Sequence, residues 1–298
     1  MSDDPISVAA IRGGTVEALH RVHAVAVDTD NRIVACAGDR TLVTFMRSSA
    51  KPLQALPLAR LPVTLEPREI GIACASHLAR PAQVDAVEAL LRRAGASEDD
   101  LVCGLEGDPP SRLNHNCSGN HAGMLLVCRD RGWDIDGYGR AGHPVQRALV
   151  AEVAAAAELS TEDVVTAGDN CGVLTFALTL ERMALAFARL AGLDGGDRVI
   201  AAMRHDPDLI RGPDSPDARL MRLHPGWVGK GGAEALLCAM SPDGIGIAAK
   251  VEDGGSRAVG PGLAAFLTRL GIDAGDLAST PVLNSRGEFV GEVVAKEA

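Results

Sequence analysis

The chain has 298 residues, of which 47% are hydrophobic, and its formal net charge is −10 at pH 7. The acidic balance argues against a nucleic-acid partner, because phosphate binding needs clustered Lys and Arg. The sequence shows neither an apolar run long enough to span a membrane nor an apolar leader, so we expect a cytoplasmic protein with no membrane partner. We expect the seven cysteines to be reduced thiols.

The first quarter of the chain predicts two strands, a helix and a further strand. Alternating apolar residues favour strands at 15–28 and 32–37, joined by a polar turn. Helical spacing favours a helix from Ser48 to Leu58, before Pro62. The apolar run 70–75 is typical of a buried strand, which would deliver the hydroxyl of Ser76 at its tip.

The middle of the chain is rich in helical spacing, and the end returns to strands. The predicted helices are 81–93 with Gly95 as terminator, 120–131, 144–157, 174–191 and 197–204. Later segments predict strands at 235–240 and 245–251, a helix at 261–270 and a hairpin around 284–287. Strands at both ends predict a single α+β unit over 1–298, with an antiparallel sheet and a helix-rich lobe at about 80–225.

Ser48 and Lys51 are the first candidates for chemistry. The chain has four lysines, and Lys51 follows Ser48 by three positions, so the two side chains share a face if the segment is helical. A desolvated Lys can lose its proton and activate a hydroxyl nucleophile, which Arg cannot do. The spacing is common enough by chance that it needs further support.

Three polar clusters supply that support. The loop 114–124 presents Cys117 and His121 one turn apart, in metal-ligand spacing. A second cluster holds Asp169 and Cys171 at a predicted helix entrance, where a dipole stabilises thiolates. In the third, Lys250 ends an apolar strand and precedes Glu252. Each has a simpler interpretation as a helix cap, a pair of core thiols or a solvated strand end.

The sequence resembles the rhizobial-type L-asparaginase family from about residue 16 to residue 253. The motifs that carry the resemblance are 47–54 (RSSAKPLQ), 74–77 (CASH), 116–124 (NCSGNHAGM), 143–146 (HPVQ), 169–172 (DNCG) and 229–234 (GKGGAE). The resemblance implies a fold related to serine β-lactamases and penicillin-binding proteins. It also implies hydrolysis of L-asparagine to aspartate and ammonia.

The resemblance further implies two Ser–Lys tandems and a zinc site. The tandems would be Ser48 with Lys51 and Ser76 with Lys250. Zinc would be held by Cys117 and Cys171, with Asp169 nearby. This chain has Asn120 where the family has a Lys zinc ligand, and a carboxamide oxygen binds zinc poorly, so water or Asp169 would complete a weaker site or no zinc would bind. Residues 78–80 also depart from the family pattern, so the family's residues at the rim of the substrate pocket cannot be carried over here.

These observations predict a mechanism. Ser48 would attack the side-chain amide of asparagine, Lys51 would take its proton, and the second tandem would pass a proton to the departing ammonia. Which serine attacks first stays open, with Ser48 favoured. The α-amino and α-carboxylate groups of asparagine would be bound by four candidates, which are Arg47, His121, Asp169 and Glu252. A homodimer is expected because twofold assemblies are common.

Two other classes of function remain as alternatives. The first is another Ser–Lys hydrolase, such as a glutaminase or a β-lactamase-like enzyme. Lys250-Val251-Glu252 stands where β-lactamases carry a Lys-Thr-Gly strand, and this counts against the latter. The second is a non-enzymatic zinc or thiol sensor that uses Cys117 and Cys171. A sensor would leave the Ser–Lys pairs without a role.

Overall fold

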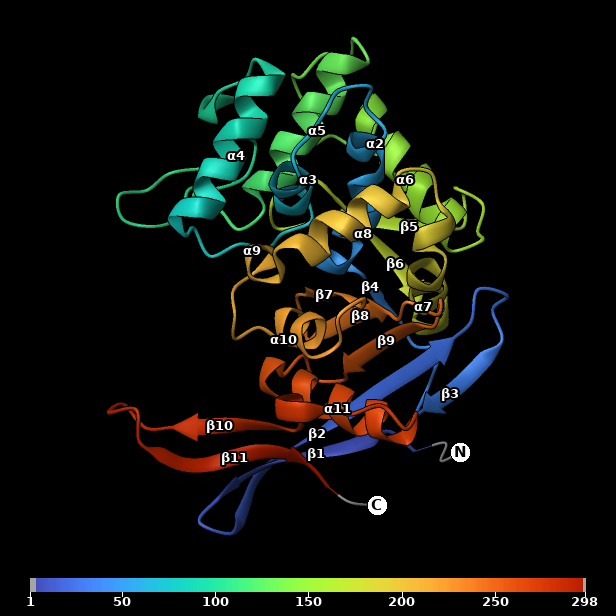
Figure 1. Cartoon of the computed structure of the whole chain (residues 1–298), viewed down its shortest axis with the longest axis vertical. Coiled ribbons are helices and arrows are strands. Elements are labelled where there is room, and N and C mark those ends of the chain that lie inside the picture. The colour runs from blue at the N-terminus through green and yellow to red at the C-terminus, as the bar shows by residue number, and fades with distance from the viewer. Residues whose placement is uncertain (1–3, 297–298) are drawn as a thin grey trace.

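The large sheet is built from strands at both ends of the chain (Figure 1). The computed structural model describes residues 4–296. Within this range the strands are paired antiparallel in the order β10 (Ser279–Leu283), β11 (Phe289–Ala295), β1 (Ile6–Arg12), β2 (Thr15–Val27), β9 (Gly246–Val251), β8 (Leu236–Met240) and β7 (Val228–Gly232), and β3 (Ile33–Ala37) also pairs with β2. The predicted α+β class, with an antiparallel sheet of terminal strands around a helix-rich middle, is confirmed.

Helices occupy most of the chain between these strands. They are α1 (Lys51–Gln54), α2 (Leu56–Ala59), α3 (Pro67–Ala73), α4 (Pro81–Ala94), α5 (Ser118–Asp130), α6 (Pro144–Ala156), α7 (Leu180–Ala188), α8 (Gly196–His205), α9 (Pro207–Ile210) and α10 (Pro216–Leu223), with α11 (Val259–Arg269) nearer the C-terminus. A short 3-10 helix, η1 (Arg47–Ala50), precedes α1, and a small sheet pairs β4 (Val43–Phe45), β6 (Leu174–Thr179) and β5 (Val165–Gly168).

The large sheet separates two hydrophobic cores. Successive residues of a strand point to opposite faces. In β2, Val25 therefore joins the core shared with the helices before β7, whereas Ala24 joins the core under α11. Figure 1 shows α11 across one face of the sheet and most other helices gathered beyond the edge that ends in β7. This arrangement brings the helical part against β7.

The predicted strand at 70–75 is wrong, because this segment belongs to helix α3. Glu66 accepts a hydrogen bond from the backbone of Glu69, whose side chain in turn accepts from the Glu66 N–H, and Pro67 occupies the first turn. This capping box and N-terminal proline start a helix. The apolar run is buried on every side, which hides the helical period. Ser76 still follows directly after a buried element, as expected.

The predicted helix at 174–191 is half strand. Residues 174–179 form β6, and Thr179 then caps α7 by accepting a hydrogen bond from the Arg182 N–H. Cys171 therefore lies in a turn that enters a strand and not a helix. The predicted helix at 48–58 is divided into η1, α1 and α2. The other predicted helices and the C-terminal hairpins are present with small shifts at their ends.

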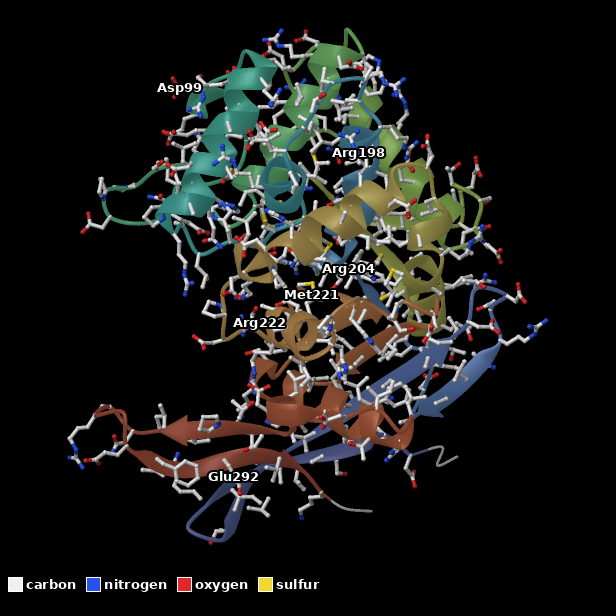
Figure 2. All side chains as sticks on the ribbon, in the orientation of Figure 1. Asp99, Arg198, Arg204, Met221, Arg222 and Glu292 are labelled. Carbon is white, nitrogen blue, oxygen red and sulfur yellow. The ribbon has the colours of Figure 1, made fainter. Side chains whose placement is uncertain are left out.

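Helix α10 lies between the helical part and the sheet. Met221 is buried in the core shared with the helices, whereas Arg222 lies at the surface and pairs with Asp208 (Figure 2). The first turn of α10 faces β7, and Gly229 and Gly231 leave room for this close approach. No helix among the described residues is long and apolar enough to cross a bilayer.

Candidate active site

The backbone before Ser48 is held in an unusual conformation. Arg47 has φ of 49°, in the left-handed region that a non-glycine residue rarely adopts. Its N–H donates to the Thr175 hydroxyl at 3.0 Å, and its Nε donates to the Asp169 carboxylate at 2.7 Å. Strand β6 and the turn before it therefore fix the entry into η1 and the position of Ser48.

Lys51, the buried first residue of α1, contacts Ser76. Lys51 Nζ donates to the Ala75 carbonyl oxygen at 2.5 Å and to Ser76 Oγ at 3.3 Å. The Ser76 backbone N–H donates to the Ile210 carbonyl oxygen at 2.7 Å, which anchors the serine itself. Lys51 follows Ser48 by three positions, and both belong to the continuous η1–α1 segment.

A second lysine, Lys230, contacts Ser76 from strand β7. Its Nζ donates to Ser76 Oγ at 3.0 Å and to the Gly231 carbonyl oxygen at 2.6 Å, and it lies 3.9 Å from the Asp217 carboxylate. The Lys230 side chain is 0% exposed, and burial lowers its pKa to about 7. An amine that loses its proton near neutral pH beside a hydroxyl can exchange protons with it.

Lys250 is not the lysine that contacts Ser76, which corrects the expected second tandem. Lys250 lies on β9, opposite Leu236 and His23, and β8 separates it from β7. Its Nζ donates to the Val251 carbonyl oxygen. Burial lowers its pKa, and the facing carboxylates, Glu234 first, oppose that fall.

A cavity of about 300 Å³ opens onto both serines. Ser48 and Ser76 line it together with the loop after β7 and the first turn of α10. Its walls also carry one basic and two acidic residues, Arg211, Glu234 and Asp217. Within the described residues Ser48 Oγ has no hydrogen-bond partner, so it is free to contact a bound molecule.

The predicted substrate-binding residues do not line this cavity. Arg47 and Asp169 are paired with each other beside η1. His121 is fully buried, with Nδ1 at 2.6 Å from the Tyr138 hydroxyl, and burial lowers its pKa to about 3. Glu252 lies at the surface, where its carboxylate pairs with Arg21 and His23.

Cys117 and Cys171 are close together, although far apart in the sequence. The pKa of the Cys117 thiol is lowered, first by a hydrogen bond with Cys171 and further by the charge of Lys51. The pKa of Cys171 is raised by the same hydrogen bond and by burial. The pair is therefore poised to hold one negative charge close to Lys51.

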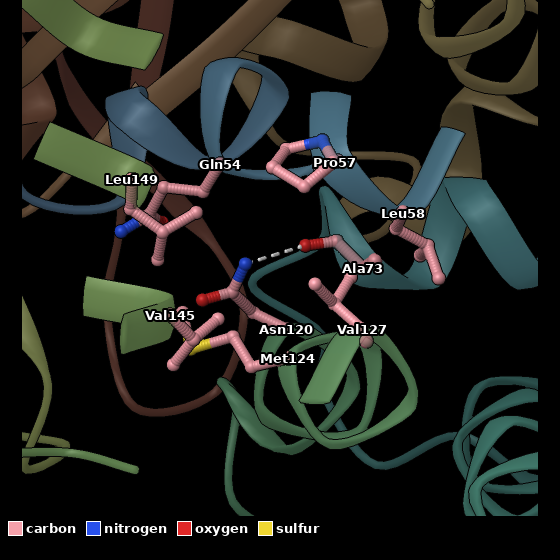
Figure 3. A pocket seen from close by; sticks show the side chains of 11 residues that line it. Gln54, Pro57, Leu58, Ala73, Asn120, Met124, Val127, Val145 and Leu149 are labelled. Atoms are coloured by element: carbon pink, nitrogen blue, oxygen red, sulfur yellow. Dashed lines mark hydrogen bonds between the residues drawn. The ribbon is translucent and has the colours of Figure 1, made fainter. Parts of the chain in front are cut away.

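The residues around these thiols do not supply the further ligands of a structural zinc site, which needs four protein donors. Asn120 directs its amide nitrogen to the Ala73 carbonyl oxygen at 3.1 Å, and it faces a small apolar void of about 10 Å³ (Figure 3). The Asp169 carboxylate is occupied by Arg47. In the described part of the chain, no group of three or more His, Cys, Asp or Glu is placed to bind a metal ion.

Sequence reasoning gave no role to Lys230, Asp217, Arg211 or Glu234. The motif 229–234 was recognised, but strand β7 is rich in glycine and lacks the apolar alternation that marks a strand. A lysine between glycines could have pointed to this site. Glycines in a strand indicate close approach of another segment, and a Cβ at Gly232 would lie 2.7 Å from the Met46 carbonyl oxygen.

Comparisons with known proteins place this chain in a family. A family model described as L-asparaginase II matches residues 8–295. Among solved structures, a Bacillus glutaminase has 14% sequence identity and a TM-score of 0.40, with 85% of this chain and 91% of that chain covered. The probable glutaminase ybaS has 17% identity and a TM-score of 0.39, with 86% and 87% covered. A structure described as Mglu in its native form has 15% identity and a TM-score of 0.37. The match covers 86% of this chain and 66% of the Mglu chain, which is longer.

The family assignment rests on the match along the sequence, because the TM-scores are too low to carry an argument. No curated protein matches the chain. The family model spans nearly every residue that the structure describes, including both serines and Lys230. The chain belongs to the L-asparaginase II family.

Proposed function

We propose that this protein is an L-asparagine amidohydrolase that forms L-aspartate and ammonia through a serine ester. The observation that carries the proposal is the contact of Ser76 Oγ with two lysine amines, Lys51 and Lys230, in the wall of a cavity that Ser48 also lines. A carboxamide is a poor electrophile with a poor leaving group, so its hydrolysis needs both an activated hydroxyl and a proton donor. Two serines and two lysines supply these groups, and membership of the L-asparaginase II family supports asparagine as the substrate.

In this proposal Ser48 is the nucleophile and Ser76 is the proton relay. Ser48 Oγ attacks the side-chain amide carbon and gives its proton to the neutral amine of Lys51. The C–N bond then breaks, and protonated Lys230 gives a proton through the Ser76 hydroxyl to the leaving nitrogen, which departs as ammonia. Water then attacks the ester and gives a proton through Ser76 to Lys230, while Lys51 returns its proton to Ser48 Oγ and aspartate is released. Ser76 is suited to the relay because both amines hold its Oγ in place.

The charged residues of the cavity are suited to the ends of an amino acid. Arg211 can bind the α-carboxylate and Glu234 can bind the α-ammonium group, since both line the cavity with opposite charge. Glu234 and Ala235 both have positive φ, 57° and 54°, in the turn between β7 and β8. Such turns favour Asn and Gly, so a Glu held there points to a functional role. A cavity of about 300 Å³ suits a ligand as small as asparagine.

A coupled ammonia assay with L-asparagine and L-glutamine tests the function. We expect release from asparagine, and a fall of about 10²-fold or more in Ser48→Ala and Ser76→Ala. Ser160→Ala, at an exposed turn, is the matched control and should retain activity. Absence of ammonia from both amides would exclude the proposal, and release from glutamine alone would make the enzyme a glutaminase.

The assignment of the nucleophile has its own test. An electrophilic asparagine analogue that traps the ester should add its mass to the peptide that contains Ser48. Ser76→Ala should still be labelled, whereas Ser48→Ala should not. A label on Ser76 instead would exchange the roles of the two serines.

A further inference from the structure

Asp217 is a buried carboxylate at the catalytic lysine that the mechanism above does not use. It lies in the first turn of α10, lines the cavity, and is 1% exposed. A carboxylate buried to this extent is costly unless it is paired and hydrogen-bonded. The structure provides both kinds of partner.

The partners of Asp217 bind it to the strand that carries Lys230. Oδ2 accepts the Gly231 N–H at 2.9 Å and lies 3.9 Å from Lys230 Nζ. Oδ1 accepts the Ala218 N–H at 3.0 Å. Because Gly231 follows Lys230 directly, this contact holds the backbone from which the lysine side chain reaches Ser76.

Asp217 also dominates the charges that favour the protonated form of Lys230. Burial lowers the pKa of Lys230 to about 7, Asp217 is the main opposing cause, and the Cys117 sulfur adds to it. Lys51 and Arg211 act in the other direction. Two buried thiols, Cys74 and Cys238, also lie near Lys230, and burial raises their pKa values to about 12, so they carry no charge near neutral pH.

We propose that Asp217 is a positioning residue that holds the Lys230 amine beside Ser76 and sets the pH range over which that amine exchanges its proton. The catalytic part of this inference rests on the proposed amidohydrolase function. The structural part does not, since it concerns the protonation of Lys230 in the free protein.

Direct titration of Lys230 tests the proposal without any substrate. The chain has four lysines, so a protein with isotope-labelled lysine gives few NMR signals, and Lys230→Arg assigns the relevant one. Asp217→Asn keeps the size of the side chain and one acceptor oxygen but removes the charge. We expect the Lys230 pKa to fall by about 1–3 units in this variant. Asp214→Asn removes the same charge from an exposed neighbour and should leave the titration unchanged.

The pH dependence of kcat/KM gives the second readout. The limb that reports Lys230 should move to lower pH in Asp217→Asn, by the shift seen in the NMR titration, and should stay in place in Asp214→Asn. Asp217→Ser, which keeps an acceptor for the Gly231 N–H, carries the same expectation if the Asn variant does not fold. An unchanged Lys230 titration in a folded variant would overturn the proposal. Absence of turnover in the wild type, with the NMR shift present, would overturn only the amidohydrolase function.

Discussion

Replacing Lys230 with Met should remove a pH dependence from the stability of the protein. Lys230 is fully buried, and its pKa falls from 10.5 to about 7 on folding. At a pH below about 7, Lys230 is protonated in both the folded and the unfolded protein, so the cost of burying its charge is present in full. As the pH rises from about 7 toward 10.5, the folded lysine is neutral while the unfolded one still binds a proton, so stability increases.

The size of this effect follows from the same shift. At about 1.36 kcal/mol per pKa unit, integration from about pH 7 to about pH 9 gives a gain of about 2 kcal/mol for the wild type. Groups that titrate alike in both proteins cancel in the comparison. Urea unfolding followed by tryptophan fluorescence at the two pH values measures the free energy of unfolding. Lys230→Met should lack this gain, and Lys296→Met, at an exposed position, should retain it. An equal rise in wild type and Lys230→Met would refute the reasoning.

Three further outcomes follow from the structure. Thr175→Val removes the hydroxyl that accepts the Arg47 N–H, so the ammonia assay should show a reduced kcat, and urea unfolding a loss of about 1 kcal/mol; unchanged values would mean that this hydrogen bond does not hold the turn. Gly232→Ala places a Cβ 2.7 Å from a backbone oxygen of Met46 and should lower the free energy of unfolding by about 1–3 kcal/mol. A thermal unfolding midpoint equal to that of the wild type would contradict this. Burial lowers the pKa of His77 to about 4, so stability should fall as the pH drops from about 6.5 to 4, and less steeply in His77→Gln. An equal loss of stability in the wild type and in His77→Gln over this pH range would contradict the prediction.

The sequence was sufficient for the fold class and for three members of the candidate site. The alternation in β2 and the helical period of α4, with Gly95 in the left-handed conformation at its end, are local signals and were interpreted correctly. Ser48, Lys51 and Ser76 were selected because their spacing, or their place after an apolar run, is visible in the chain. Their roles stay predictions.

The remaining differences have two physical causes, which are burial on all sides of an element and contacts between segments that are distant in the sequence. Helix α3 was interpreted as a strand for the first of these reasons. Lys250 was singled out because it ends an apolar strand, and the family resemblance implied its pairing with Ser76. Strand β7, which carries Lys230, is instead rich in glycines that let η1 and α10 approach closely. Such contacts between distant segments leave no regular pattern in the sequence.

The pairing of β2 with β9 has a consequence for synthesis on the ribosome. Val22 lies opposite Val251, so the centre of the sheet closes only after more than two hundred further residues have been translated. Pairings of this sequence separation are slow to form and expose apolar strands in the meantime. Lys230 also emerges late, long after Ser48 and Ser76. A nascent chain should therefore depend on chaperones to shield β2, and it should acquire its chemistry only near the end of translation.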